Sequence, residues 1–102
     1  GKNMVTIDQI KEVLHEEKDN LLKLGIEKVG IFGSYIRGEA GPDSDIDILI
    51  DVASDSELTL FSLVEIEQRI SEKLNNKIDI VIKSDLKPFI SERILSEVEY
   101  VS

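Results

Sequence analysis

Cysteine is absent from this chain of 102 residues, and histidine occurs only once, as His15. Without cysteine, the chain cannot form disulfides, thiolate zinc sites or a cysteine nucleophile. One histidine excludes a cluster of several metal-binding histidines and argues against a Ser-His-Asp triad. No apolar run approaches the ~18 residues of a membrane span, and no signal peptide is recognisable. We therefore expect one small domain over residues 4–100, in the cytoplasm and without a membrane partner. Residues 1–3 precede a methionine and are expected to be foreign to the natural chain.

Basic residues are also missing from one long stretch, between Arg37 and Arg69. Outside this stretch acidic and basic residues balance, so the entire net charge of −9 arises within it. Such a field repels nucleic-acid backbones and attracts cations, so direct nucleic-acid binding is not expected. A solvated acidic surface that serves only solubility explains the same composition. The acids of the stretch are Glu39, Asp43, Asp45, Asp47, Asp51, Asp55, Glu57, Glu65 and Glu67.

Hydrophobic periodicity predicts three helices and three strands in alternation. The helices are expected over 7–24, 57–75 and 87–98, and the strands over 28–32, 45–52 and 77–82. Thr6 with Gln9, and Ser54 with Glu57, are typical of capping boxes at the starts of the first two helices. A short helical turn is expected at 35–38. The resulting order α-β-α-β-α-β-α predicts an α/β fold of α+β-like character. Its three-stranded mixed sheet is flanked by helices, with the first strand pair antiparallel and the second parallel.

Three aspartates are expected on one face of this sheet. Asp45 and Asp47 are two residues apart on a strand whose isoleucines face the core, so their side chains share the other face. Asp79 interrupts the apolar strand IDIVI and projects from the same face if the two strands are neighbours. Converging carboxylates suit Mg²⁺, and two such ions can clamp the oxygens of a phosphoryl transfer. Acids on an exposed strand edge would show the same spacing, so both interpretations stay open here.

Gly33 and Ser34 lie between a strand and the expected helical turn. Backbone N–H groups at such a turn can hold a phosphate, and glycine lets the ligand approach closely. Arg37 follows three residues later and is able to pair with a phosphate oxygen. The alternatives are a plain turn at Gly33-Ser34 and, for Arg37, a role as counter-ion of the acidic stretch.

Residues 33–50, GSYIRGEAGPDSDIDILI, contain the pattern G-S-x10-D-x-D. This pattern resembles the signature of the nucleotidyltransferase superfamily that includes DNA polymerase beta. The short chain, the GSYxRG opening and the SDID core resemble the minimal nucleotidyltransferases, which are partners of HEPN proteins in bacterial and archaeal toxin–antitoxin operons. The resemblance covers nearly the whole chain, from the helix before the first strand to the segment KIDIV.

The resemblance implies a nucleotidyltransferase fold with assigned residues. The catalytic and Mg²⁺-ligating carboxylates, for two ions, would be Asp45, Asp47 and Asp79, the last helping to activate the attacking hydroxyl. The nucleoside triphosphate would be bound by Gly33, Ser34, Arg37 and Ser44. The implied reaction transfers AMP from ATP to a hydroxyl and releases pyrophosphate. In the family the acceptor is a tyrosine of the HEPN toxin, and the modification silences its RNase.

Two other functions remain open from the sequence. One is an antitoxin that neutralises its partner by binding alone. A chain this short lacks a second domain to enclose the nucleotide base or the acceptor of the transfer. The other is a nucleotidyltransferase that acts on a small molecule or on nucleic acid. The missing substrate domains argue against both substrates, and the charge of −9 argues further against nucleic acid.

Overall fold

The structure is a computed structural model that describes residues 4–101, so the prediction for residues 1–3 lies outside the described residues. Its α-helices are α1 (Ile7–Glu16), α2 (Lys18–Lys23), α3 (Ser34–Arg37), α4 (Leu60–Leu74) and α5 (Pro88–Glu97), with a 3-10 turn, η1, at Lys83–Asp85. Its strands are β1 (Ile26–Phe32), β2 (Ile46–Val52), β3 (Ile78–Ile82) and β4 (Glu99–Val101). None of the helices within residues 4–101 is long and apolar enough to cross a membrane.

The sheet has the strand order β3-β2-β1-β4. As predicted, β1 and β2 are antiparallel, and β2 and β3 are parallel and joined through α4. The prediction of three strands was wrong, because β4 adds an antiparallel fourth strand along the free edge of β1. A strand of three residues is too short for alternation to be detected, and its pairing with distant β1 decides its conformation.

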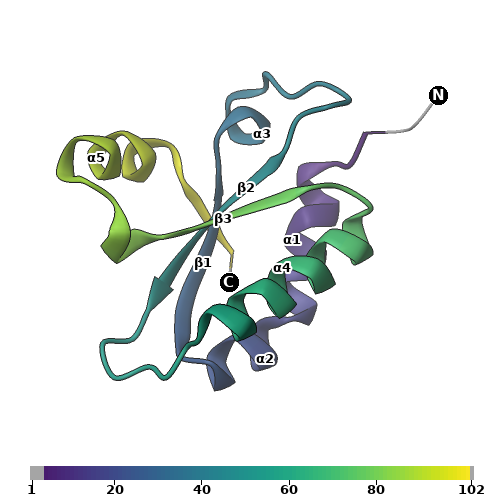
Figure 1. Ribbon diagram of the computed structural model, residues 1–102. Coiled ribbons are helices and arrows are strands. Elements are labelled where there is room, and N and C mark those ends of the chain that lie inside the picture. The colour runs from purple at the N-terminus through teal and green to yellow at the C-terminus, as the bar shows by residue number, and fades with distance from the viewer. Residues whose placement is uncertain (1–3, 102) are drawn as a thin grey trace.

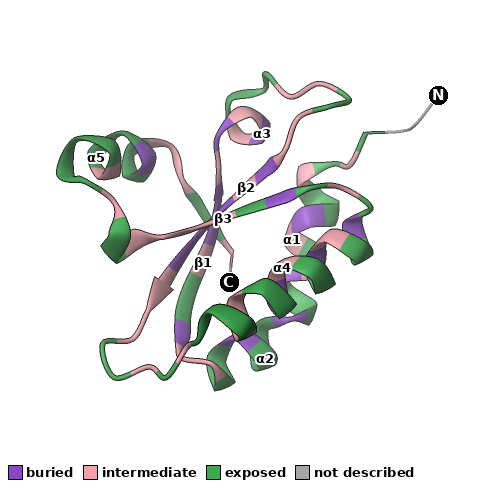
Figure 2. Ribbon diagram, viewed as in Figure 1, coloured by how far each residue is buried: buried purple, intermediate pink, exposed green. Residues whose placement is uncertain are grey.

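Helices cover both faces of the sheet. Figure 1 shows α1, α2 and α4 together on one side of the strands and α5 on the other. The side with three helices holds the main core, where Ile46, Ile48 and Ile50 are buried as predicted, and Figure 2 shows this burial along the strands. Leu49 is buried as well, on the opposite face. Val98, the residue directly after α5, lies against Gly30, and Gly30 is the β1 partner of Leu49.

The helix predicted over 7–24 is two helices, because the chain bends at Glu17. The N-terminal capping box of Thr6 and Gln9 is present, and Gly25 follows the last helical turn with φ of 86°. Glutamate is a good helix former, so local propensity does not explain the bend. The Glu17 side chain is buried and forms ion pairs with Arg69 and Lys73 of α4, and this tertiary contact accompanies the bend.

The capping box predicted at Ser54 and Glu57 was also wrong. The N-cap of α4 is Thr59, whose hydroxyl accepts a hydrogen bond from the N–H of Ser62 at 3.1 Å. The preceding loop is tied to the end of α2 instead, because the Ser56 hydroxyl donates to the carbonyl of Leu24 at 2.6 Å. Helix α4 therefore begins three residues later than its sequence pattern suggested.

Candidate active site

Asp47 and Asp79 are direct partners in the parallel pairing of β2 and β3. Asp45 immediately precedes β2, two residues before Asp47, and therefore projects from the same face. The structure thus brings the three predicted carboxylates to one end of one sheet face. The predicted parallel neighbours β2 and β3 produce this arrangement, because parallel partners in register share a face.

The charge environment differs among the acids of this face. Lys77 Nζ lies 3.8 Å from Asp45, and Lys83 Nζ lies 3.8 Å from Asp51. Asp47 forms no such ion pair with any residue between 4 and 101. Burial raises the pKa of Asp47, and the neighbouring charges of Asp79 and Asp45 raise it further. The charge of Arg37 acts in the opposite direction, but the pKa of this central carboxyl remains raised.

The chemistry of these side chains fits a divalent cation. Carboxylate oxygens are the ligands that Mg²⁺ prefers, and a bound cation would offset the repulsion centred on Asp47. Across residues 4–101 no three acidic or histidine side chains are already gathered in a closed cation site. The donor set therefore matches Mg²⁺ in type and charge, while its side chains still have to be drawn together.

Gly33 lies against this carboxylate group, at the end of β1. Its φ of 77° is in the left-handed region that favours glycine. A Cβ atom at this position would collide with the Asp47 carboxylate, whose Cγ would be only 2.9 Å away. Glycine at 33 therefore allows the backbone to turn into α3 while passing directly over Asp47.

The remaining predicted residues occupy different surroundings. Ser34 is half-buried and begins α3. Ser44 closes the turn before β2, where its hydroxyl accepts a hydrogen bond from the N–H of Gly41 at 2.8 Å. Tyr35 points away from the carboxylates into the main core, and its hydroxyl accepts a hydrogen bond from the side chain of Asn76 at 3.3 Å. Nucleotide binding by Ser34 and Ser44 stays a prediction.

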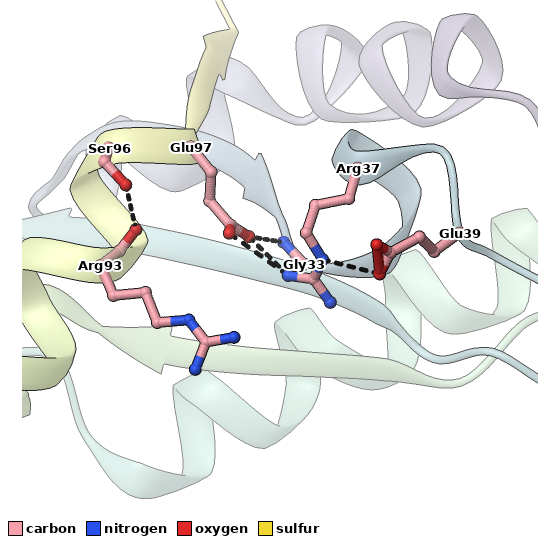
Figure 3. Close-up of polar contacts among 6 residues, drawn as sticks. All are labelled: Gly33, Arg37, Glu39, Arg93, Ser96 and Glu97. Carbon is pink, nitrogen blue, oxygen red and sulfur yellow. Dashed lines mark hydrogen bonds and ion pairs between the residues drawn. The ribbon is translucent and has the colours of Figure 1, made fainter.

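Glu97 is a member of the site that the sequence analysis missed. Figure 3 shows its carboxylate facing both Gly33 and Arg37, and it accepts a hydrogen bond from the Gly33 N–H at 2.6 Å. Arg37 donates to both Glu97 oxygens, at 3.0 and 3.2 Å, and to Glu39 at 3.0 Å. Arg37 is thus paired with Glu39 of the acidic stretch and with Glu97 from outside it, and its role in phosphate binding stays a prediction. No local pattern marks Glu97, because it lies 60 residues from Arg37 in the sequence.

Comparison with known families agrees with this geometry. Residues 7–101 match the nucleotidyltransferase domain family. The chain belongs to this family. It is 40% identical, over 99 residues, to the protein adenylyltransferase MntA of Thermococcus cleftensis, a match that covers 96% of this chain and 98% of the relative.

Solved structures give the same fold. A candidate minimal nucleotidyltransferase superimposes with a TM-score of 0.80 and 27% identity, over 97% of this chain and 98% of that one. The fold also matches, with a TM-score of 0.56 and 18% identity, a complex of a tri-AMPylated Shewanella oneidensis HEPN toxin with its MNT antitoxin. That match covers 84% of this chain and 69% of that one. The nucleotidyltransferase fold implied by the sequence resemblance is confirmed.

Proposed function

We propose that this chain is a Mg²⁺-dependent protein adenylyltransferase that transfers AMP from ATP to a tyrosine hydroxyl of a HEPN RNase toxin and so acts as its antitoxin. The observation that carries the proposal is the placement of Asp45, Asp47 and Asp79 at one end of a sheet face, beneath the Gly33 turn. The 40% identity to a protein adenylyltransferase over nearly the full length of both chains supports the same reaction.

Each part of the site has a role in this proposal. Asp45, Asp47 and Asp79 would hold the metal, which would supply positive charge to the phosphates and to the attacking and leaving oxygens. The turn at Gly33-Ser34, with Arg37 and Ser44 beside it, receives the triphosphate. The protein thereby positions groups and offsets charge, and these are the main contributions that phosphoryl transfer requires.

The proposed reaction exchanges one phosphorus–oxygen bond for another. The acceptor hydroxyl oxygen bonds to the α-phosphorus of ATP, and the bond from that phosphorus to the bridging oxygen of the β-phosphate breaks. Pyrophosphate leaves with the bonding electron pair. The hydroxyl proton passes to a nearby base, and we assign Asp79 to this step because it is an exposed carboxylate beside Asp47.

A protein acceptor agrees with the surface of the chain. The acidic stretch between Arg37 and Arg69 contains no basic residue, so it suits a partner with a basic face. Three large apolar side chains are unusually exposed, namely Leu60, Phe61 and Phe89, at 75%, 86% and 83% of their full area. Single exposed apolar side chains are ordinary on protein surfaces, so these three add to the proposal only as groups that a bound partner would cover. The cytoplasmic location stays a prediction.

Intact-mass spectrometry of the neighbouring HEPN protein tests the proposal directly. The HEPN protein is incubated with this chain, ATP and Mg²⁺, and a mass gain in whole AMP units is expected. The double variant Asp45→Asn, Asp47→Asn should abolish the gain. Asp51→Asn is the matched control, because Asp51 lies farther along β2 with Lys83 as its partner, and it should leave the gain intact.

The outcomes separate the candidate functions. Toxin neutralisation by the wild type, but not by the double variant, together with the mass gain would establish an enzymatic antitoxin. A stable complex without any mass gain, and neutralisation by the double variant, would instead identify an antitoxin that acts by binding. A chain that neither modifies nor binds the HEPN protein, but transfers AMP to the hydroxyl of a small molecule, would be a nucleotidyltransferase with a small-molecule substrate.

A further inference from the structure

The negatively charged carboxylate of Glu97 accepts hydrogen bonds from two donors at the Gly33 turn. It is the last residue of α5, and its side chain retains 17% of its accessible area. One oxygen, Oε2, accepts from the Gly33 N–H at 2.6 Å and from Arg37 at 3.0 Å. The other oxygen accepts from the same Arg37 nitrogen at 3.2 Å. These are charge-assisted hydrogen bonds, which are stronger than neutral ones.

The same two donors are the ones that the proposed function assigns to nucleotide phosphates. A backbone N–H carries a single proton and points in one direction, so it cannot fully serve a carboxylate and a phosphate oxygen together. Arg37 has a second carboxylate partner in Glu39, which accepts from Nε, while Nη1 donates to Glu97. A phosphate oxygen that binds the Gly33 N–H must therefore replace Glu97 there.

We propose that Glu97 is an intramolecular competitor of the nucleotide, which fills the phosphate position in the free protein and is displaced when ATP binds. The inference rests on the proposed function, because it takes Gly33 and Arg37 to be phosphate donors there. Nucleotide binding then releases the Glu97 side chain from the Gly33 turn. The cost of that release lowers the apparent affinity for ATP in proportion to the fraction of protein held by Glu97.

The electrostatics of the site also favour release once the phosphates of the nucleotide take the donors of Glu97. Glu97 adds to burial, Asp79 and Asp45 in raising the pKa of Asp47, so it is one more like charge beside the carboxylate group. Its hydrogen bonds to Gly33 and Arg37 hold it there against that repulsion. When phosphate takes those donors, no other hydrogen bond or ion pair within residues 4–101 retains the carboxylate.

Calorimetric titration with ATP and Mg²⁺ tests this competition without requiring turnover. Glu97→Gln should bind ATP about 5- to 20-fold more tightly than the wild type, since the amide loses the ion pair with Arg37. Glu97→Asp keeps the charge but shortens the side chain, and it should also bind ATP more tightly. Glu92→Gln is the matched control, because it removes one charge from an exposed position on the same helix. Its affinity should remain within about twofold of the wild type.

Each result distinguishes the inference from the function on which it rests. Equal ATP affinity of the wild type and both Glu97 variants would overturn the competition and leave the proposed function standing. An equal gain of ATP affinity in Glu92→Gln would attribute the effect to the general loss of one negative charge. This result would also overturn the competition. Weaker binding by Glu97→Asp and Glu97→Gln, in proteins with wild-type melting curves, would make Glu97 a support of the site rather than a competitor. Absence of ATP binding by every variant and the wild type would overturn both proposals.

Discussion

Asp47 on β2 and Asp79 on β3 are paired in register on adjacent parallel strands, so two carboxylates of like charge share one sheet face. Asp47 is the less exposed of the two, and among residues 4–101 no cation lies in ion-pair contact with it. Like charges at this separation destabilise the folded chain, and the raised pKa of Asp47, due first to burial, reflects that cost. The site therefore keeps a repulsion that a more stable protein would lack.

Asp47→Asn should for this reason stabilise the metal-free protein while abolishing AMP transfer. We expect the free energy of unfolding to rise by about 0.5–1 kcal/mol, measured by urea denaturation with chelator present. Asp51→Asn is the control and should give no gain, because Asp51 already faces Lys83. A loss of stability in Asp47→Asn would show that its charge is favourably compensated.

The stabilising effect of Mg²⁺ on the folded protein should depend on Asp47 as well. Millimolar Mg²⁺ is expected to raise the melting temperature of the wild type, because a ligand that binds only the folded state stabilises it. Asp47→Asn should lose most of this increase, and Asp51→Asn should keep it. Equal Mg²⁺ effects on all three proteins, in differential scanning fluorimetry, would place cation binding elsewhere on the acidic surface.

Gly33→Ala should be much more damaging than Gly38→Ala, although both glycines have positive φ. The space around Gly38 is open, so alanine there meets only the backbone penalty of about 1 kcal/mol. Alanine at 33 also collides with the Asp47 carboxylate, and we expect a total loss of about 2–4 kcal/mol. Urea denaturation of the two variants measures the difference. Similar losses would mean that Asp47 moves aside freely.

Glu17→Gln should lower stability near neutral pH by about 1–2 kcal/mol, as urea denaturation measures it. Burial alone would raise the pKa of Glu17, but the hydrogen bond from Asn20 and the charges of Lys73 and Arg69 outweigh it. The net pKa in the folded state is therefore below the ordinary 4.5. The charged form is bound more favourably in the folded protein, so its contribution is complete above that pH and disappears as the pH falls below it.

The difference between the wild type and Glu17→Gln should accordingly shrink in acid, below about pH 4.5. Glu16→Gln is the control, since Glu16 is exposed and reaches Lys73 only at 3.5 Å. Its effect should stay under about 0.5 kcal/mol. A difference for Glu17→Gln that persists unchanged at low pH would show that packing, not charge, is responsible.

Gly30→Ala tests the placement of the chain after α5. A Cβ at this position would lie 2.6 Å from Cγ2 of Val98, so the variant should lose about 1–3 kcal/mol by overpacking. Val98→Ala should recover part of that loss, because it removes the colliding methyl group. Urea denaturation of the single and double variants gives the coupling energy. Strict additivity would mean that Val98 does not cover Gly30 in solution.

Much of the fold and of the carboxylate group could be predicted because the signals are local. The two-residue period of DIDILIDV sets Asp45 and Asp47 on one face, and the long helix between β2 and β3 fixes their parallel pairing. Asp79 falls in phase with Asp47 as a consequence. The strand–turn junction at Gly33 is equally local, since glycine there interrupts an apolar run.

Features that depend on distant contacts could not be predicted. The bend at Glu17, the start of α4 at Thr59 and the short strand β4 all contradict or escape their local patterns. Glu97 looks like an ordinary surface residue near a helix end until α5 is folded over the sheet beside Gly33. Sequence alone thus determined which side chains share a strand face, because backbone geometry repeats every two residues. Only the tertiary structure decided which carboxylate meets which donor, because that depends on packing between segments some 60 residues apart.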